Sequence, residues 1–171
     1  MTPTIRATIA ALVMIISVMA SAAPFHEKRF NGSDESWAIV PSNTYASFVK
    51  SWPDKDQSVL CAVIKSPADW DAVFGSAAVM NSDRPFAPAA DFYSRANLLV
   101  VARVHTASSS TTPSFQVKSI KHHTHSTVMR YVYHPPPADQ SFSLTDTLMI
   151  AIGKQKSKVY FFENGVKVCE K

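Results

Sequence analysis

Histidines are the residues whose spacing comes nearest to metal chemistry in this chain. His122, His123 and His125 lie close together, and a strand would place His123 and His125 on one face because side chains alternate. His105 or His134 from a neighbouring strand could supply a third nitrogen ligand, a set that suits zinc or copper. No Cys, Asp or Glu lies near them in the sequence, and histidines in an exposed turn are often only solvated. A periplasmic metal-binding protein built on this turn is therefore the alternative hypothesis, and we expect no cofactor.

Nucleophilic and acid-base catalysis find little support. A Ser-His-acid hydrolase would have to use Ser108–Ser110, His105 and Asp91, but no Gly-x-Ser-x-Gly sequence is present to expose a nucleophile on a strained turn. Acidic residues are few and scattered, which argues against a pair of glycosidase carboxylates. The chain has only 4 glycines, so it holds no glycine-rich phosphate loop. We expect a protein that is not an enzyme.

A hydrophobic strand has to position these polar groups. The segment Asn97–His105 contains five consecutive apolar residues, which is short for a globular helix and predicts a central strand buried on both faces. One face would carry Leu98, Val100, Ala102 and Val104, and the other Leu99, Val101, Arg103 and His105. Because the second face turns polar at Arg103, we expect its cover to end there and the strand to emerge toward solvent.

The remaining elements indicate an α+β fold, a mainly antiparallel β-sheet of about six strands with two short helices. One helix is expected between Ser42 and Pro53, because its apolar residues have i, i+3, i+4, i+7 spacing, and another begins at Ser66-Pro67. The expected strands are Trp37–Val40 at an edge, Val59–Ile64, a hairpin of Phe115–Ile120 and Val128–Tyr133 with a bulge near 117–120, Leu148–Ile152, and a hairpin of Val159–Glu163 and Val166–Cys169. Asn164-Gly165 would close this last hairpin as a type I′ turn and set Tyr160 opposite Cys169.

The N-terminal residues predict export. Arg6 precedes an apolar run, and Ala20-Ser21-Ala22 offers the small residues that signal peptidase requires. The run is shorter than the roughly 20 residues that span a bilayer. We predict a signal peptide at 1–22, a mature start at Ala23, a single globular domain at 23–171, and a periplasmic or secreted protein without membrane insertion after cleavage.

Charge and cysteine content limit the partners further. The chain carries 17 Lys and Arg against 13 Asp and Glu, and the basic residues are dispersed, so we expect no nucleic-acid partner. Cys61 and Cys169 are the two cysteines, and an oxidising compartment favours a disulfide between them. The alternatives to the disulfide are two buried free thiols or one reactive thiol.

Four short motifs follow one another in an order that resembles a known family. They are a helix containing Trp70, a loop ending in Asp91-Phe92, the hydrophobic strand Leu98–Val101, and Thr112-Pro113-Ser114-Phe115. Over residues 64–152 this order resembles the C-terminal domain of the PrcB family, exported bacterial proteins associated with a surface protease complex. The family has Thr-Gly-Gly-Tyr at the last motif, so the turn geometry and any contact made by that turn do not carry over. The resemblance implies a protein partner in the cell envelope.

The leading hypothesis is therefore an exported, non-catalytic binding or accessory module, directed at a protein. Loops held by a rigid sheet commonly carry binding residues, and the polar loop Thr106–Ser114 and the proline-rich loop Pro135–Asp139 flank the sheet. The candidate binding residues are Arg103, His105, Ser109, Ser110, Thr111 and Thr112.

Overall fold

The structure is a computed structural model that describes residues 25–27, 30, 37–50, 59–77, 83–109 and 114–171. The expected signal peptide and mature start lie outside these residues. The described residues hold ten strands and two helices, which confirms the α+β class and exceeds the six or so strands expected. No helix among them has the length and apolar character needed to cross a membrane.

The first sheet is built around the strand that the apolar run predicts. It is antiparallel, and its order is β1 (Trp37–Val40), β8 (Ser143–Gly153), β5 (Ala96–Thr106) and β3 (Leu60–Ile64). β5 is an interior strand, and it pairs with β8 along its whole length, from Ala96 opposite Gly153 to Thr106 opposite Ser143. The central position of β5, the edge position of β1 and the place of the 148–152 run beside β5 are all confirmed.

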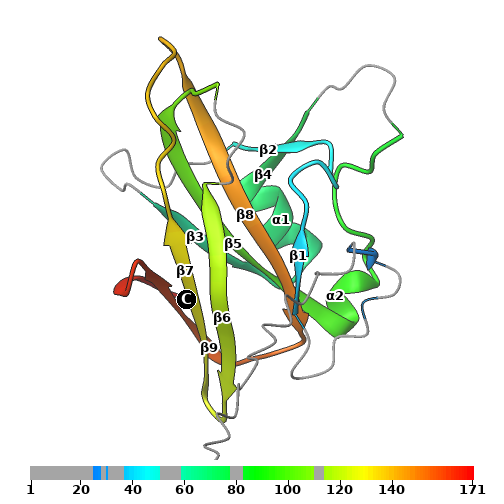
Figure 1. Cartoon of the computed structure of the whole chain (residues 1–171). Coiled ribbons are helices and arrows are strands. Elements are labelled where there is room, and N and C mark those ends of the chain that lie inside the picture. Colours follow the sequence, from blue (N-terminus) through cyan, green and yellow to red (C-terminus); the bar gives the residue numbers. More distant parts are fainter. Residues whose placement is uncertain (1–24, 28–29, 31–36, 51–58, 78–82, 110–113) are drawn as a thin grey trace, which may run out of the picture.

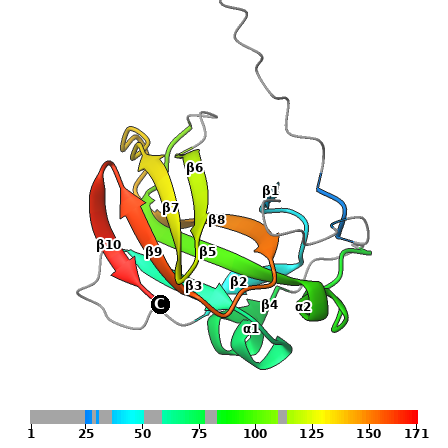
Figure 2. The same cartoon turned by 90° about the horizontal axis from the view of Figure 1, so that it is seen from below.

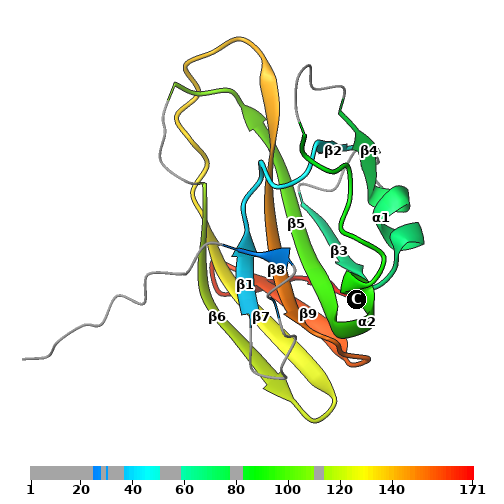
Figure 3. The ribbon, with the colours of Figure 1, turned by 90° about the vertical axis from the view of Figure 1, so that its right-hand side faces the viewer.

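A second sheet packs face to face on the first (Figure 2). Its order is β10 (Val166–Glu170), β9 (Lys158–Glu163), β7 (Ser126–Tyr133) and β6 (Phe115–His123), with β7 and β9 parallel and the other pairs antiparallel. The opposite face of the first sheet is covered by α1 (Pro67–Val73), α2 (Phe92–Arg95) and a small antiparallel pair of β2 (Ser47–Val49) and β4 (Phe74–Ser76) (Figure 3).

Two hydrophobic cores lie on the two faces of the first sheet. Leu99, Val101 and Ile150 pack between the sheets with Met129 and Phe161. The other core contains Leu98, Val100 and Met149 from the first sheet, together with Trp70 of α1 and Phe92 of α2. Alternate residues of β5 therefore enter different cores, as its alternation predicts.

One of the two predicted helices forms and the other does not. α1 begins where expected, with the Ser66 hydroxyl accepting a hydrogen bond from the Asp69 backbone N–H at 3.2 Å. The helix expected between Ser42 and Pro53 is wrong: residues 47–49 form β2 and pair with β4, and Phe48 is exposed. The second helix is instead α2, which starts at the expected loop end Asp91-Phe92. Trp52 lies outside the described residues.

Both predicted hairpins form. The register of β6 and β7 shifts between Val117 and Ser119, which confirms the bulge. Between β9 and β10, Asn164 and Gly165 have φ of 50° and 87°, the left-handed pair that a type I′ turn needs. The expected register of this second hairpin is wrong, because a shift between Lys167 and Cys169 sets Cys169 opposite Phe161.

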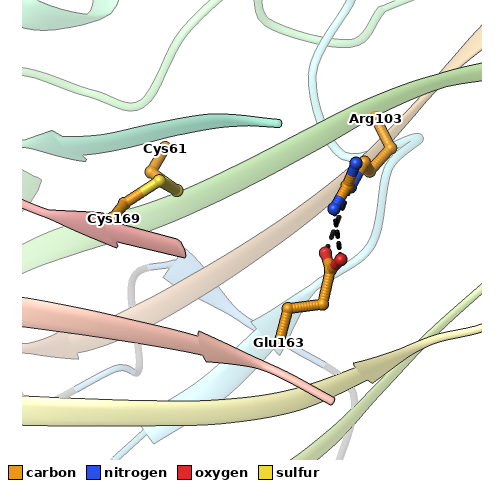
Figure 4. The surroundings of a disulfide bond; sticks show 4 residues. All are labelled: Cys61, Arg103, Glu163 and Cys169. Carbon is orange, nitrogen blue, oxygen red and sulfur yellow. Dashed lines mark hydrogen bonds and ion pairs between the residues drawn. A yellow bond between two sulfur atoms is a disulfide. The ribbon is translucent and has the colours of Figure 1, made fainter. Parts of the chain in front are cut away.

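The predicted disulfide forms between Cys61 and Cys169 and closes one side of the molecule (Figure 4). Cys61 belongs to β3, an edge strand of the first sheet, and Cys169 belongs to β10, an edge strand of the second. The bond therefore joins the two sheets covalently at neighbouring edges.

Candidate functional site

The β5–β8 pair projects past the second sheet at one end of the molecule (Figure 1). We name this projection, residues 104–109 and 139–145, the ribbon end. Three large apolar side chains are about half exposed there: Val104 at 52%, Phe142 at 55% and Leu144 at 47%. Leu144 is paired with His105 and Val104 with Thr145, so Leu144 lies on one face of the ribbon and Val104 on the other. Phe142 is two residues before Leu144, and neighbouring exposed apolar side chains such as these two are typical of a contact surface.

Hydrogen bonds fix the backbone of the ribbon end beyond the paired strands. The Ala107 N–H donates to the Phe142 carbonyl at 2.7 Å, and the Gln140 N–H donates to the Ala107 carbonyl at 3.2 Å. The Ser109 N–H and hydroxyl both donate to the Asp139 carboxylate, and the hydroxyl is the main cause of a lowered Asp139 pKa. The two loops predicted to carry binding residues are thus joined to each other.

The candidate binding residues divide into three groups. Ser109 lies at the ribbon end with its side chain bound to Asp139. Ser110, Thr111 and Thr112 lie outside the described residues. Arg103 and His105 point toward the space between the sheets, because they share the face of β5 that carries Leu99 and Val101.

Arg103 corrects the expectation that this face of β5 opens to solvent. Its side chain is 15% exposed and forms a two-pronged ion pair with Glu163 of β9, with Nε 3.1 Å from Oε2 (Figure 4). The guanidinium carbon also lies 5.3 Å from the centre of the Tyr133 ring. The cover continues past Arg103 because the second sheet supplies a carboxylate and an aromatic ring there. This pairing gives Arg103 a role in holding the sheets together.

His105 lies in a chain of polar groups that has the wrong order for a hydrolase. Its Nε2 is 3.1 Å from Asp146 Oδ2, and the Ser114 hydroxyl donates to that same oxygen. A catalytic triad needs the histidine between the serine and the acid, so that imidazole takes the serine proton. Here the carboxylate stands between them, so these contacts give the serine no base.

The histidine turn lies at the opposite end of the molecule, where β6 meets β7 (Figure 1). His122 and His123 end β6, and Thr124-His125 form the turn. The His122 Nδ1 contacts the Gln155 amide Nε2, while the Gln155 Oε1 accepts hydrogen bonds from the Thr127 and Ser157 hydroxyls. Thr127 is fully buried, so this network forms a fixed polar base beneath the turn.

The same geometry weighs against a metal centre. Among the residues that the structure describes, no three His, Cys, Asp or Glu side chains are grouped so that they could hold a metal ion. Because two hydroxyls on Gln155 Oε1 orient its amide, the His122 Nδ1 accepts from Nε2, and the neutral ring keeps its proton on the other nitrogen. His122 therefore offers no free lone pair for a metal.

Four of the five tyrosines have a raised pKa because they are buried. Removal from water raises the pKa of Tyr45, Tyr93, Tyr131 and Tyr133, and the Glu27 and Glu163 carboxylates add to the effect at Tyr45 and Tyr131. A phenol with a raised folded-state pKa stabilises the fold fully below its unfolded pKa of about 10, and this contribution is lost as the pH rises above it.

We therefore expect alkaline unfolding to accompany tyrosine ionisation. Absorbance at 295 nm should show these four phenols ionising only as the circular dichroism signal of the fold is lost, whereas in guanidinium all five should titrate near pH 10. Reversible ionisation of three or more phenols in the folded protein would contradict this prediction.

No family model, curated protein or solved structure matches this chain. The resemblance to the PrcB C-terminal domain thus stays a prediction. The site has to be argued from the chain's own geometry, which brings together groups that sequence reasoning did not connect. Glu163, Asp146 and Gln155 are the main residues that were missed. Sheet packing brings Glu163 to its partner, strand pairing between β5 and β8 brings Asp146, and the connection from β8 to β9 brings Gln155; no local spacing marks any of them.

Proposed function

We propose that this chain is an exported, non-catalytic binding module that contacts a protein partner of the cell envelope through the ribbon end. The observation that carries the proposal is the exposure of Phe142 and Leu144, two residues apart on a projecting, hydrogen-bonded pair of strands. Aromatic and apolar anchors with a polar surround are the usual energetic centre of a protein interface. Asp139, Ser109 and Gln140 supply polar groups beside these anchors.

The fixed backbone of the ribbon end supports a binding role. Ordering a loop on association costs free energy, and a surface that is already ordered avoids that cost. Ala107 ties the two connections together through both its N–H and its carbonyl, and Ser109 does so through Asp139. The apolar side chains are therefore presented in one arrangement before any partner arrives.

Two further features support the export of the chain and the envelope location of its partner. A disulfide between sheet edges is typical of proteins from an oxidising compartment, which agrees with the export that the N-terminal sequence predicts. The resemblance to the PrcB C-terminal domain suggests that the partner belongs to a surface protease complex.

The proposal is tested by Phe142→Ser and Leu144→Ser in one variant of the exported protein. We expect the melting temperature to change by no more than about 2 °C, since both side chains are half exposed and lie outside the cores. A photo-crosslinker at position 140, an exposed position of the ribbon end near Phe142, should capture an envelope protein with the wild-type side chains at 142 and 144 and lose it in this variant.

Phe86→Ser is the matched control, because Phe86 is equally exposed but lies outside the ribbon end. It should keep the crosslink, and the captured protein should bind the purified wild-type chain directly. Equal crosslinking by the Phe142/Leu144 variant and the control would exclude the ribbon end as the contact surface.

A further inference from the structure

A basic cleft lies at the end of the molecule away from the ribbon end. It has a volume of about 1090 Å³ and is lined by the β6–β7 turn and the connection from β8 to β9. We call it the basic cleft, and its lining residues are His122, His123, Thr124, His125, Gln155, Lys156, Ser157 and Lys158. This lining contains three imidazoles and two ammonium groups, and it contains no carboxylate.

Several donors of the basic cleft have no acceptor in the part of the chain that the structure describes. The His122 Nε2 is buried without a hydrogen-bond partner, and it carries a proton because Nδ1 accepts from Gln155. Lys156 is exposed and takes part in no ion pair among the described residues. His123 and His125 are exposed as Lys156 is, so these three side chains, and not the buried Nε2, are within reach of a bound oxyanion.

The carboxylate that pairs with a lysine of the cleft is already neutralised. Glu170 of β10 pairs with Lys158 at 2.8 Å and with Lys167 at 3.2 Å, and its pKa is lowered chiefly by the hydrogen bond from Lys158. Glu170 therefore offsets Lys158 but leaves Lys156 and the imidazoles without a counter-charge.

We propose that the basic cleft binds a multivalent oxyanion, a ligand carrying several phosphate or sulfate groups. The volume is large for a single small ion, and the donors come from two adjacent segments, the β6–β7 turn and the connection from β8 to β9. Exposed cations bind individual anionic groups weakly, so only a ligand that engages several of them at once is held. This site goes beyond the proposed protein contact and lies at the other end of the molecule.

The test uses the full chain with its disulfide, at low salt. Tripolyphosphate should give saturable amide chemical-shift changes at residues 122–127 and 154–158. Lys156→Ala should weaken its binding about threefold. The triple variant Lys156→Ala, His123→Ala and His125→Ala should weaken it more than about tenfold.

Lys50→Ala is the control, because Lys50 is an exposed lysine beside β2 on the other side of the first sheet, and it should leave the affinity unchanged. Sedimentation with phosphatidylglycerol vesicles distinguishes a lipid headgroup from a soluble ligand as the source of the phosphate. Unchanged affinity in the triple variant overturns the proposal, and so does an absence of saturable shifts. Stoichiometric zinc binding at the turn without tripolyphosphate binding would likewise overturn it in favour of a metal site.

Discussion

Replacing Cys61 and Cys169 together by alanine is expected to lower the free energy of unfolding by about 4 kcal/mol, measured by urea denaturation. The two cysteines are 108 residues apart in the sequence, so the bond closes a very long loop. In the chain-entropy description, a crosslink of this span removes a large part of the freedom of the unfolded chain. The crosslink also holds edge strands β3 and β10 together, so its loss frees one side of the two-sheet core.

A reductant provides the control for the disulfide prediction. Adding it to the wild type should bring its unfolding midpoint close to that of the double variant, whereas the double variant should not respond to it. A loss of less than about 1 kcal/mol, or an equal response of both proteins to the reductant, would show that the crosslink contributes little to this fold.

Local patterns account for the parts of the fold that were predicted correctly. The apolar run of β5 identified an interior strand because both of its faces are buried, and its alternation assigned Leu98 and Leu99 to different cores. Ser66 and Asn164-Gly165 were equally informative, since a helix cap and a type I′ turn depend on neighbouring residues only.

The predicted helix at 42–53 failed because its apolar spacing has a second explanation. Tyr45 is buried and donates its hydroxyl to Glu27 at 2.7 Å, while Phe48 faces solvent. The backbone of residues 47–49 is satisfied by β4, a strand that begins only after α1 ends. Tertiary pairing thus overrode a helical pattern of four residues, which is a weak signal on its own.

The sequence predicted only those residues of the candidate sites that lie together in one strand or one turn. The histidine turn was found from the sequence, but its partners Gln155 and Ser157 come from a connection some thirty residues later. Arg103 was noticed for its place on β5, yet Glu163 is 60 residues away and reaches it only because the two sheets pack together. Such pairings follow from sheet topology, which a single sequence does not specify.

The second large effect on the free energy of unfolding is expected at the Arg103–Glu163 ion pair. Glu163→Gln should lower the free energy of unfolding by about 3 kcal/mol, because it removes the charge that neutralises a guanidinium held in the space between the sheets. The double variant Arg103→Met with Glu163→Leu should be more stable than the sum of the two single losses predicts, since it leaves no buried charge uncompensated. Urea denaturation of the wild type, Arg103→Met, Glu163→Leu and the double variant gives this coupling directly, and Glu163→Gln is measured beside them.

Lys158→Met is the matched control for the buried pair, because it breaks an exposed ion pair with Glu170 on the same sheet and should leave the unfolding midpoint nearly unchanged. If Glu163→Gln behaves like this control, the ion pair contributes little to stability, and Arg103 remains a candidate binding residue, as the sequence suggested. If the loss is large and is relieved in the double variant, Arg103 holds the two sheets together, and binding is left to the ribbon end.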